Sequence, residues 1–202
     1  MPNWCGNTMA VYGSPAELKD FHQKLVNARE KGDQLKHWHL YQIYEEFGYT
    51  EQEILESDSN GYIRGYFDDI TDIEVTNDGV SYFKLYYESA WAPMIDGFDW
   101  LIQRHYQTLA QVTIAEECGC EVYINTDVTG RFFPDKYVLD IEDDDVYYCE
   151  SEKEVVNIFN DYITNPNKKC KTIKDCYRYL SIHDGYLSPN EENYATLHEF
   201  GY

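Results

Sequence analysis

A short turn signal near the middle of the chain limits the possible folds more than any other feature. Asn77-Asp78-Gly79 separates a strand-like run, Ile73-Glu74-Val75, from a second run that extends from Val80 to Tyr87. Two such runs around an Asn/Asp-Gly turn predict a β-hairpin, because these residues accept the positive φ angles of tight turns. The chain therefore contains an antiparallel pair of strands, and the elements on either side decide its fold class.

The segments on either side of this hairpin alternate between strand and helix patterns. The sequence from Trp4 to Gly13 predicts a strand, and Ser14-Pro15-Ala16-Glu17 is a capping box that predicts a helix ending near Gly32. Ala92-Pro93 closes the hairpin, and apolar residues about one turn apart predict a helix over 94–106. Further strands are expected over 112–115, 121–124 and 137–141.

The order strand, helix, strand, strand, helix, strand is that of a split βαβ, or ferredoxin-like, sandwich. We therefore predict an α+β domain over residues 1–145, with an antiparallel sheet and an insertion at about 33–69. Three helix-start signatures follow, at Ser151, Thr172 and Ser188. They predict a helical C-terminal appendage over residues 146–202.

Acidic residues outnumber basic ones and are concentrated in two stretches. The sequence has 202 residues, with 37 Asp and Glu against 16 Lys and Arg, which gives a net charge of −21. Residues 41–75 carry −9 of this charge and residues 140–154 carry −7. This balance argues against membrane-surface binding and against a broad phosphate-binding groove, because both need surplus Lys and Arg. Concentrated negative charge instead favours contact with a basic partner.

The chain has no segment typical of a membrane span or a signal peptide. No stretch approaches about eighteen uncharged apolar residues, and the first residues lack the continuous apolar run of a signal sequence. Without an export signal, the six cysteines are interpreted as reduced, buried apolar residues. These features predict a cytoplasmic protein without membrane contact.

The sequence contains no catalytic signature and no complete metal site. His37 and His39 would share one face of an extended segment, as zinc or nickel ligands do, but no third ligand is identifiable. The segment from Glu56 to Ile63 imitates the start of a calcium loop, yet Phe67 stands where a bidentate acid is required. We therefore predict no metal and no cofactor, and an enzyme of unrecognised type stays as an alternative.

Short motifs within residues 1–7, 88–93 and 116–123 resemble the YubB-type ferredoxin-like proteins of phages and plasmids. The most specific is Met-Pro-Asn-Trp-Cys-Gly-Asn at residues 1–7, and the second is Glu88-Ser89-Ala90-Trp91-Ala92-Pro93. The third is Glu116-Glu117-Cys118-Gly119 with the aromatic residue Tyr123. The sequence departs from the family pattern at residues 61–66, where a Trp-Gly-x-Lys-Trp-like block is expected. The resemblance implies a mobile-element origin and a ferredoxin-like fold, and it provides no catalytic residue.

The leading hypothesis is a non-enzymatic accessory protein of a phage or other mobile element, in the cytoplasm of a bacterial host. It would bind a host or phage protein through acidic, Tyr-rich surfaces, for example as an anti-defence inhibitor that occupies a basic nucleic-acid groove. The alternative is binding of single-stranded nucleic acid on the sheet, which is disfavoured because the basic cluster, 168–178, lies in the appendage. The residues predicted to contact the partner are Tyr62, Tyr66, Glu142, Asp143, Asp144, Asp145, Tyr147 and Tyr148.

Overall fold

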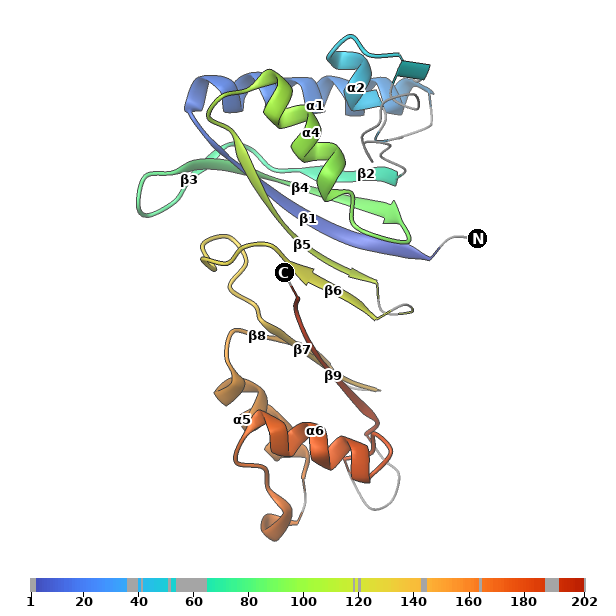
Figure 1. The fold of residues 1–202 in the computed structure, drawn as a ribbon, viewed down its shortest axis with the longest axis vertical. Helices are drawn as coiled ribbons and strands as arrows, with labels where there is room; N and C mark the ends of the chain where they lie inside the picture. Colours follow the sequence, from blue (N-terminus) through green and yellow to red (C-terminus); the bar gives the residue numbers. More distant parts are fainter. Residues whose placement is uncertain are drawn as a thin grey trace. The chain divides into compact units, whose positions relative to one another are not determined.

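The computed structural model describes residues 3–35, 40, 42–50, 52–53, 65–117, 119, 121–142, 145–163, 165–187 and 193–201. The chain divides into two compact units, Met1–Thr126 and Asp127–Tyr202, and each has its own sheet and its own hydrophobic core (Figure 1). Among the described residues, no helix combines the length and the apolar character needed to cross a membrane.

The first unit contains a six-stranded antiparallel sheet. Its strands are β1 (Trp4–Gly13), β2 (Gly65–Ile70), β3 (Glu74–Val75), β4 (Ser81–Ala90), β5 (Ala110–Glu117) and β6 (Val122–Asn125). Its helices include α1 (Pro15–Leu35), α2 (Gln42–Glu46) and α4 (Ile95–His105). The strands pair in the order β2-β4-β1-β5-β6, and the short β3 also pairs with β4. The predicted α+β class with an antiparallel sheet is therefore confirmed.

The predicted hairpin is present as β3, a tight turn and β4. The N–H of Gly79 donates to the carbonyl of Thr76 over 2.9 Å, and Gly79 has a φ of 86°, which only glycine adopts without strain. The segment expected to be an insertion, 33–69, contains α2 and also β2, which is an edge strand of the sheet. Part of this segment therefore belongs to the sheet itself.

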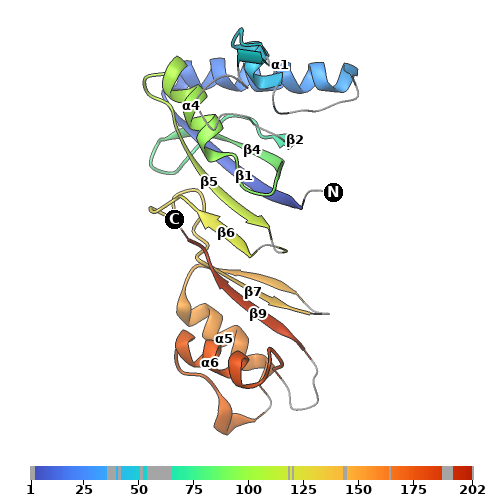
Figure 2. The ribbon, with the colours of Figure 1, turned by 45° about the vertical axis from the view of Figure 1, so that its right-hand side comes forward.

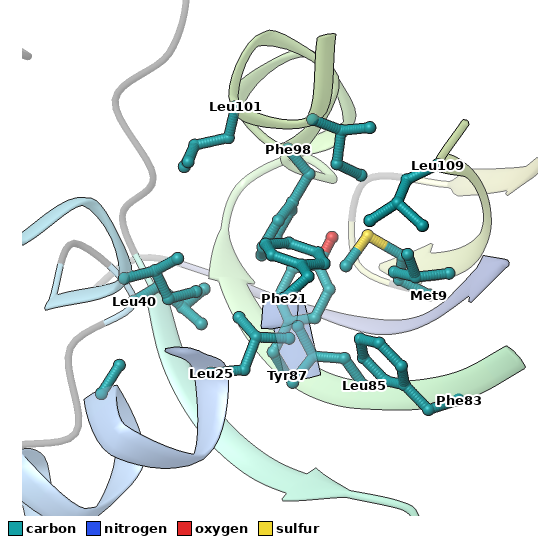
Figure 3. Packing of buried hydrophobic residues seen from close by; sticks show 14 of the residues in the cluster. Met9, Phe21, Leu25, Leu40, Phe83, Leu85, Tyr87, Phe98, Leu101 and Leu109 are labelled. Atoms are coloured by element: carbon teal, nitrogen blue, oxygen red, sulfur yellow. The ribbon is translucent and has the colours of Figure 1, made fainter. Parts of the chain in front are cut away.

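Helices α1, α2 and α4 lie on one side of this sheet (Figures 1 and 2). Alternate residues of the central strands point toward them, as the two-residue period of a strand requires. Figure 3 shows the resulting core, in which side chains from α1 and α4 meet side chains from β1 and β4. Its fully buried members include Met9, Phe21, Leu25, Phe83, Leu85, Phe98 and Leu101.

Helix α1 begins at Pro15, as predicted, but Glu17 does not close a local capping box on Ser14. Its carboxylate accepts the N–H groups of Gln107 (3.2 Å) and Thr108 (2.9 Å) and the Thr108 hydroxyl (2.6 Å). The N–H of Ser14 donates to Thr108 Oγ1 instead. The hydrogen bonds from Thr108 hold the pKa of Glu17 below its usual range. A tertiary contact with the loop before β5 therefore replaces the local one.

The second unit has a three-stranded antiparallel sheet and helices on one side of it (Figure 1). Its strands are β7 (Tyr137–Ile141), β8 (Val146–Cys149) and β9 (Ala195–Glu199), in the order β8-β7-β9. Its helical elements include α5 (Glu152–Tyr162), the 3-10 turn η2 (Pro166–Lys168) and α6 (Ile173–Ile182).

The helix starts predicted at Ser151 and Thr172 are confirmed. Ser151 Oγ accepts the N–H of Glu154 over 3.3 Å at the start of α5. At the start of α6, Thr172 Oγ1 accepts the N–H of Asp175 over 3.3 Å, and Asp175 accepts the N–H of Thr172 over 2.9 Å. The second pair is a complete capping box.

The third predicted helix, beginning at Ser188, is wrong, because residues Ala195–Glu199 form β9. Ser188 itself lies outside the described residues. Ala195 and Leu197 are buried and alternate with more exposed residues, and pairing with β7 fixes this strand period. The expected appendage 146–202 thus contains strands as well as helices. The boundary between the units falls before β7, because β7 pairs with β8 and β9.

Four cysteines in the described part of the chain are buried free thiols: Cys5, Cys149, Cys170 and Cys176. For these four the predicted role as buried apolar residues is confirmed. Burial raises the pKa of Cys149 to about 11, so its thiol is protonated at neutral pH. Cys118 and Cys120 lie outside the described residues.

Candidate functional site

The face of the six-stranded sheet that points away from the helices carries tyrosines and carboxylates. In β4, Phe83, Leu85 and Tyr87 belong to the core. Strand alternation then places four other residues on the opposite face: Tyr82, Lys84, Tyr86 and Glu88. In β1, Met9 and Val11 belong to the core, and the same rule places Trp4, Thr8 and Tyr12 on the face opposite to it.

One row across this face holds two carboxylates flanked by two tyrosines. The pairing register lines up five residues in the order Tyr66, Glu88, Gly6, Glu116, Tyr123. Neighbouring strands are about 4.8 Å apart, so the backbones of Glu88 and Glu116 are separated by roughly 10 Å. Gly6 lies between them, and a Cβ added there would meet no atom closer than 3.9 Å. The two carboxylates therefore flank a position that has no side chain.

Aromatic side chains surround this row at the edge of the sheet. The rings of Trp4 and Tyr66 have their centroids 5.0 Å apart, and Tyr66 is 39% exposed. Further along the face, Tyr82 donates a hydrogen bond of 2.6 Å to Glu74 Oε2, which raises the pKa of this tyrosine. Aromatic rings beside carboxylates match the two properties of an arginine side chain, its flat face and its positive charge.

The three segments that carry the family resemblance meet at one corner of the sheet. Asn7 is buried, and its amide donates to Cys5 O (2.6 Å) and to Ser89 Oγ (2.8 Å). Ser89 Oγ donates in turn to Ala92 O over 2.8 Å. These bonds tie the start of β1 to the end of β4 and to the turn that follows it.

Trp91 lies at this corner with a strained backbone conformation and an exposed side chain. Its N–H donates to Asn3 O over 2.9 Å, its φ is 73°, and its side chain is 51% exposed. A bulky residue at positive φ is uncommon and is most often retained at functional sites. An exposed tryptophan is also the residue type most enriched at the centre of protein interfaces.

The interior of the same corner contains a buried carboxylate. Glu117 is 6% exposed, and its Oε1 accepts the N–H of Gly119 over 3.1 Å. Within the described part of the chain, its Oε2 has no hydrogen-bond partner. Buried polar atoms without partners are rare in native proteins. The unpaired carboxylate oxygen therefore distinguishes this corner from an ordinary packed region.

We define the tyrosine–carboxylate face as Trp4, Tyr12, Tyr66, Glu74, Tyr82, Lys84, Tyr86, Glu88, Glu116 and Tyr123. It holds three carboxylates against the single ammonium group of Lys84. Of these residues, only Tyr66 is among the contact residues predicted from the sequence. The alternation of Tyr82, Lys84, Tyr86 and Glu88 with apolar residues is the signal that identifies the others.

The remaining predicted contact residues lie in the second unit or outside the described residues. Glu142 and Asp145 are exposed and flank the turn between β7 and β8. Tyr62, Asp143 and Asp144 lie outside the described residues. Glu142 and Asp145 thus belong to a different unit from Tyr66, which lies in β2.

Tyr147 and Tyr148 point to opposite faces of the small sheet. Tyr147 packs against the core of the second unit, and its hydroxyl is 2.7 Å from that of Tyr162. Tyr148 is opposite Val138 in the register and is 45% exposed. Of the predicted contact residues that the structure describes in this hairpin, the exposed ones are Glu142, Asp145 and Tyr148.

A small hollow on the helical side of the first unit collects titratable groups. Its volume is about 190 Å³, and Asp20, Lys24, Glu46, His105 and Tyr106 line it. Tyr106 donates to Asp20 over 2.6 Å, and His105 Nε2 lies 3.0 Å from the hydroxyl of Tyr49. Burial lowers the pKa of His105. These groups pair with one another in a space smaller than a typical ligand site of about 300 Å³ or more, so we assign them a structural role.

The described residues contain no group of three or more His, Cys, Asp or Glu side chains arranged to hold a metal ion. His37 and His39, the candidate ligands in the sequence, lie outside that part of the chain, as does the calcium-loop-like segment 56–63. Comparisons with protein-family models, with curated proteins and with solved structures each find no match to this chain.

Proposed function

We propose that this chain is a non-enzymatic binding protein whose tyrosine–carboxylate face holds an arginine- and lysine-rich segment of another protein. The observation that carries the proposal is the row of Tyr66, Glu88, Gly6, Glu116 and Tyr123. An arginine that enters the gap at Gly6 would meet a carboxylate on either side, and a longer basic segment would continue onto the neighbouring tyrosines.

The sheet corner supplies the aromatic anchors for such a partner. Trp91 and Tyr66 are exposed, and Trp4 packs against Tyr66. Large rigid rings bury much area and lose little side-chain entropy on binding, which is why they dominate interface energies. Carboxylates around them give selectivity for a basic partner and accelerate its association.

The same residues disfavour direct nucleic-acid binding on this sheet. Bases can stack on exposed tyrosines, but the strand must also find cations for its phosphates. Here Glu74, Glu88 and Glu116 would repel phosphates, and Lys84 alone would attract them. A protein that itself grips nucleic acid offers the complementary charge, so the partner we propose is a host or phage protein with a basic nucleic-acid groove.

The fold and the resemblance support a mobile-element context for this function. The strand order β2-β4-β1-β5 with helices on one face supports the proposal of a split βαβ, ferredoxin-like fold, in which β3 and β6 would be additions. The three segments that resemble YubB-type proteins converge at the sheet corner. We infer an accessory protein of a phage or plasmid that acts in the bacterial cytoplasm, for example as an anti-defence inhibitor.

The β7–β8 hairpin provides a second acidic contact in this proposal. Glu142 and Asp145 are exposed beside the turn, and Tyr148 is exposed on β8, an edge strand. This hairpin would attract the same kind of basic partner through its own negative charge. The hairpin is therefore expected to add affinity without being sufficient for binding.

Fluorescence anisotropy with a labelled, twelve-residue arginine-rich peptide tests the proposal. The variant Glu88→Gln/Glu116→Gln should bind this peptide at least about tenfold more weakly, because two charge-assisted contacts are lost. The matched control is Glu30→Gln/Glu45→Gln, which removes two exposed carboxylates from α1 and α2 on the helical side. Equal affinity of both variants for the peptide would refute the assignment of the face.

The aromatic part of the proposal has its own variant. Tyr66→Ala truncates an exposed ring and should weaken peptide binding several-fold while leaving the unfolding midpoint nearly unchanged. A twelve-nucleotide single strand of DNA that binds the Glu88/Glu116 face more tightly than the peptide does, with affinity lost in Tyr66→Ala, would favour the nucleic-acid alternative.

A further inference from the structure

The second unit has a groove of about 520 Å³ between η2 and α6. This volume falls in the range of small-molecule sites, about 300–1,000 Å³. The residues that decide its chemistry are Lys168, Lys169, Lys171, Arg178, Tyr179 and Ile182. In a chain with a net charge of −21, the lining of this groove combines four cations with the aromatic ring of Tyr179 and the aliphatic side chain of Ile182.

The cations of the groove outnumber the carboxylates that line it. Lys168, Lys169, Lys171 and Arg178 are exposed, and no ion pair within 4.0 Å joins them to a carboxylate among the described residues. The lining also includes Asp175, whose Oδ2 already accepts the N–H groups of Lys171 (3.1 Å) and Thr172 (2.9 Å). Four cations against this one carboxylate repel one another unless an anion lies between them.

The backbone that carries these cations is held in place before any ligand arrives. The side chain of Asn160 in α5 donates to Cys170 O over 2.9 Å and accepts the N–H of Cys170 over 2.8 Å. Asn165 caps η2 by accepting the N–H of Asn167 over 3.0 Å. The capping box on α6 fixes the other end of the loop. A loop that is ordered in advance loses less entropy on binding.

The apolar wall of the groove comes from α6. The ring of Tyr179 packs on Phe159 at 5.7 Å and on His183 at 4.4 Å between centroids, and its hydroxyl donates to Leu187 O over 3.1 Å. These contacts fix the orientation of the ring. Ile182 lies one turn further along, at the rim, and is 66% exposed. A fixed aromatic ring and an exposed aliphatic side chain form a surface suited to a flat, apolar group.

We propose that this groove binds a nucleoside phosphate, with the phosphate held by Lys168, Lys169, Lys171 and Arg178 and the base placed against Tyr179 and Ile182. Phosphate oxygens match the ammonium and guanidinium groups, and the base matches the apolar wall. The ligand can be a free nucleotide or one nucleotide of a single strand, because both present the same chemistry. The site is separate from the tyrosine–carboxylate face and does not depend on its function.

Titration of the full chain with ADP and with a labelled twelve-nucleotide single strand tests the proposal, at about 50 mM salt to limit screening. The variant Lys171→Gln/Arg178→Gln should bind at least about tenfold more weakly. Lys174→Gln is the matched control, because Lys174 is exposed on the same helix but does not line the groove. The affinity of the Lys174→Gln variant should differ less than about twofold from that of the unaltered protein, because salt screens the interaction between Lys174 and the bound phosphate.

The two sources of the ligand give different patterns. Tight binding of the single strand with a steep salt dependence, and weak binding of ADP, would assign the groove to nucleic acid. Comparable binding of ADP and the strand would assign it to a free nucleotide. Absence of binding for both probes, or equal loss in Lys174→Gln and in the groove variant, would overturn the proposal.

Ile182→Ser tests the apolar half of the site at an exposed position. It should weaken ADP binding several-fold and leave the affinity for pyrophosphate, which has no base, unchanged. Equal affinities of the Ile182 variant and the unaltered protein for ADP would overturn the placement of the base. So would a phosphorylated peptide that binds more tightly than either nucleotide probe.

Discussion

The two units of this chain have the same layered construction but present opposite chemistry. Each places helices on one face of an antiparallel sheet. In the first unit, the candidate site is the sheet face, where tyrosines alternate with carboxylates. In the second, it is the helical side, where a groove gathers lysines and an arginine. The same arrangement of helices on a sheet thus leaves the candidate site on the sheet in one unit and on the helices in the other.

The distribution of cations explains the difference. Residues 1–126 contain 21 acidic and eight basic residues, and residues 127–202 contain 16 and eight. In the first unit, Arg29 pairs with Asp69 and Lys31 pairs with Glu46. In the second unit, five of the eight basic residues fall within residues 168–178. The net charge of −21 is therefore the sum over an acidic candidate surface in the first unit and a basic one in the second.

The largest expected effect is the loss of stability when a buried residue is truncated in one of the two cores. Phe159 is fully buried in the second unit, and Phe159→Ala should lower the free energy of unfolding by about 3–5 kcal/mol. All four tryptophans lie within residues 1–126, so tryptophan fluorescence reports on the first unit alone. In urea, Phe159→Ala should move the circular-dichroism transition and leave the fluorescence midpoint in place.

The reciprocal variant is Phe83→Ala, which removes a fully buried ring from the first unit. It should move the fluorescence midpoint by a comparable free energy. If either variant shifts both signals equally, the units unfold as one, and the comparison between independent units fails.

A medium effect is expected at the first residue of the second unit. The buried carboxylate of Asp127 accepts the N–H groups of Phe132 (2.6 Å), Phe133 (3.0 Å) and Thr129 (3.1 Å), and the Thr129 hydroxyl (2.6 Å). Burial raises the pKa of Asp127, but these hydrogen bonds together lower it below its usual range. Asp127→Asn should lower the free energy of unfolding by about 1–3 kcal/mol at pH 7, because an amide nitrogen cannot accept these bonds.

The pH dependence of this effect has a definite sign. Because the folded-state pKa of Asp127 is below the unfolded value of about 3.9, its contribution is fully present above that value. It is lost as the pH falls through the folded-state pKa. Urea unfolding at pH 7 and pH 3 should therefore show a smaller difference between Asp127→Asn and the unaltered protein at pH 3. The exposed Asp161→Asn serves as control, and a gap that widens at low pH would contradict this role.

The smallest effect concerns the cap of α6, which borders the groove. Thr172→Ala removes the side-chain half of the capping box and should lower the free energy of unfolding by about 1 kcal/mol. Thr172→Ser keeps the hydroxyl and should recover most of this loss. The measurement is urea unfolding followed by circular dichroism. Equal loss in both variants would show that the methyl group, and not the cap, matters here.

Local signals in the sequence predict much of the fold. The hairpin turn at residues 77–79 and the helix starts at Ser151 and Thr172 depend on side chains within four residues of one another, so they are visible in the sequence. The β9 strand is not, because its partner in β7 lies more than fifty residues away. Glu17 shows the same limit, since Thr108 takes the place of the local cap.

The candidate sites are less predictable for the same reason. The alternation in β4 is local, but the row from Tyr66 to Tyr123 exists only through the register of five strands. The basic cluster at residues 168–178 is visible in the sequence, whereas its apolar wall depends on how α6 packs against α5. Patterns of charge along a chain therefore locate candidate surfaces, whereas the residues that complete each site are known only from the fold.

The central place of β1 in its sheet has a consequence for synthesis. The strand pairs only with partners made much later, since Trp4 is opposite Ala90 and Gly6 is opposite Glu116. As the chain leaves the ribosome, its first strand has both edges open until β4 and then β5 have emerged. Such distant pairings slow folding, and they leave an apolar strand open to other chains in the meantime. The order of translation thus leaves β1 without its partners until most of the first unit has been made.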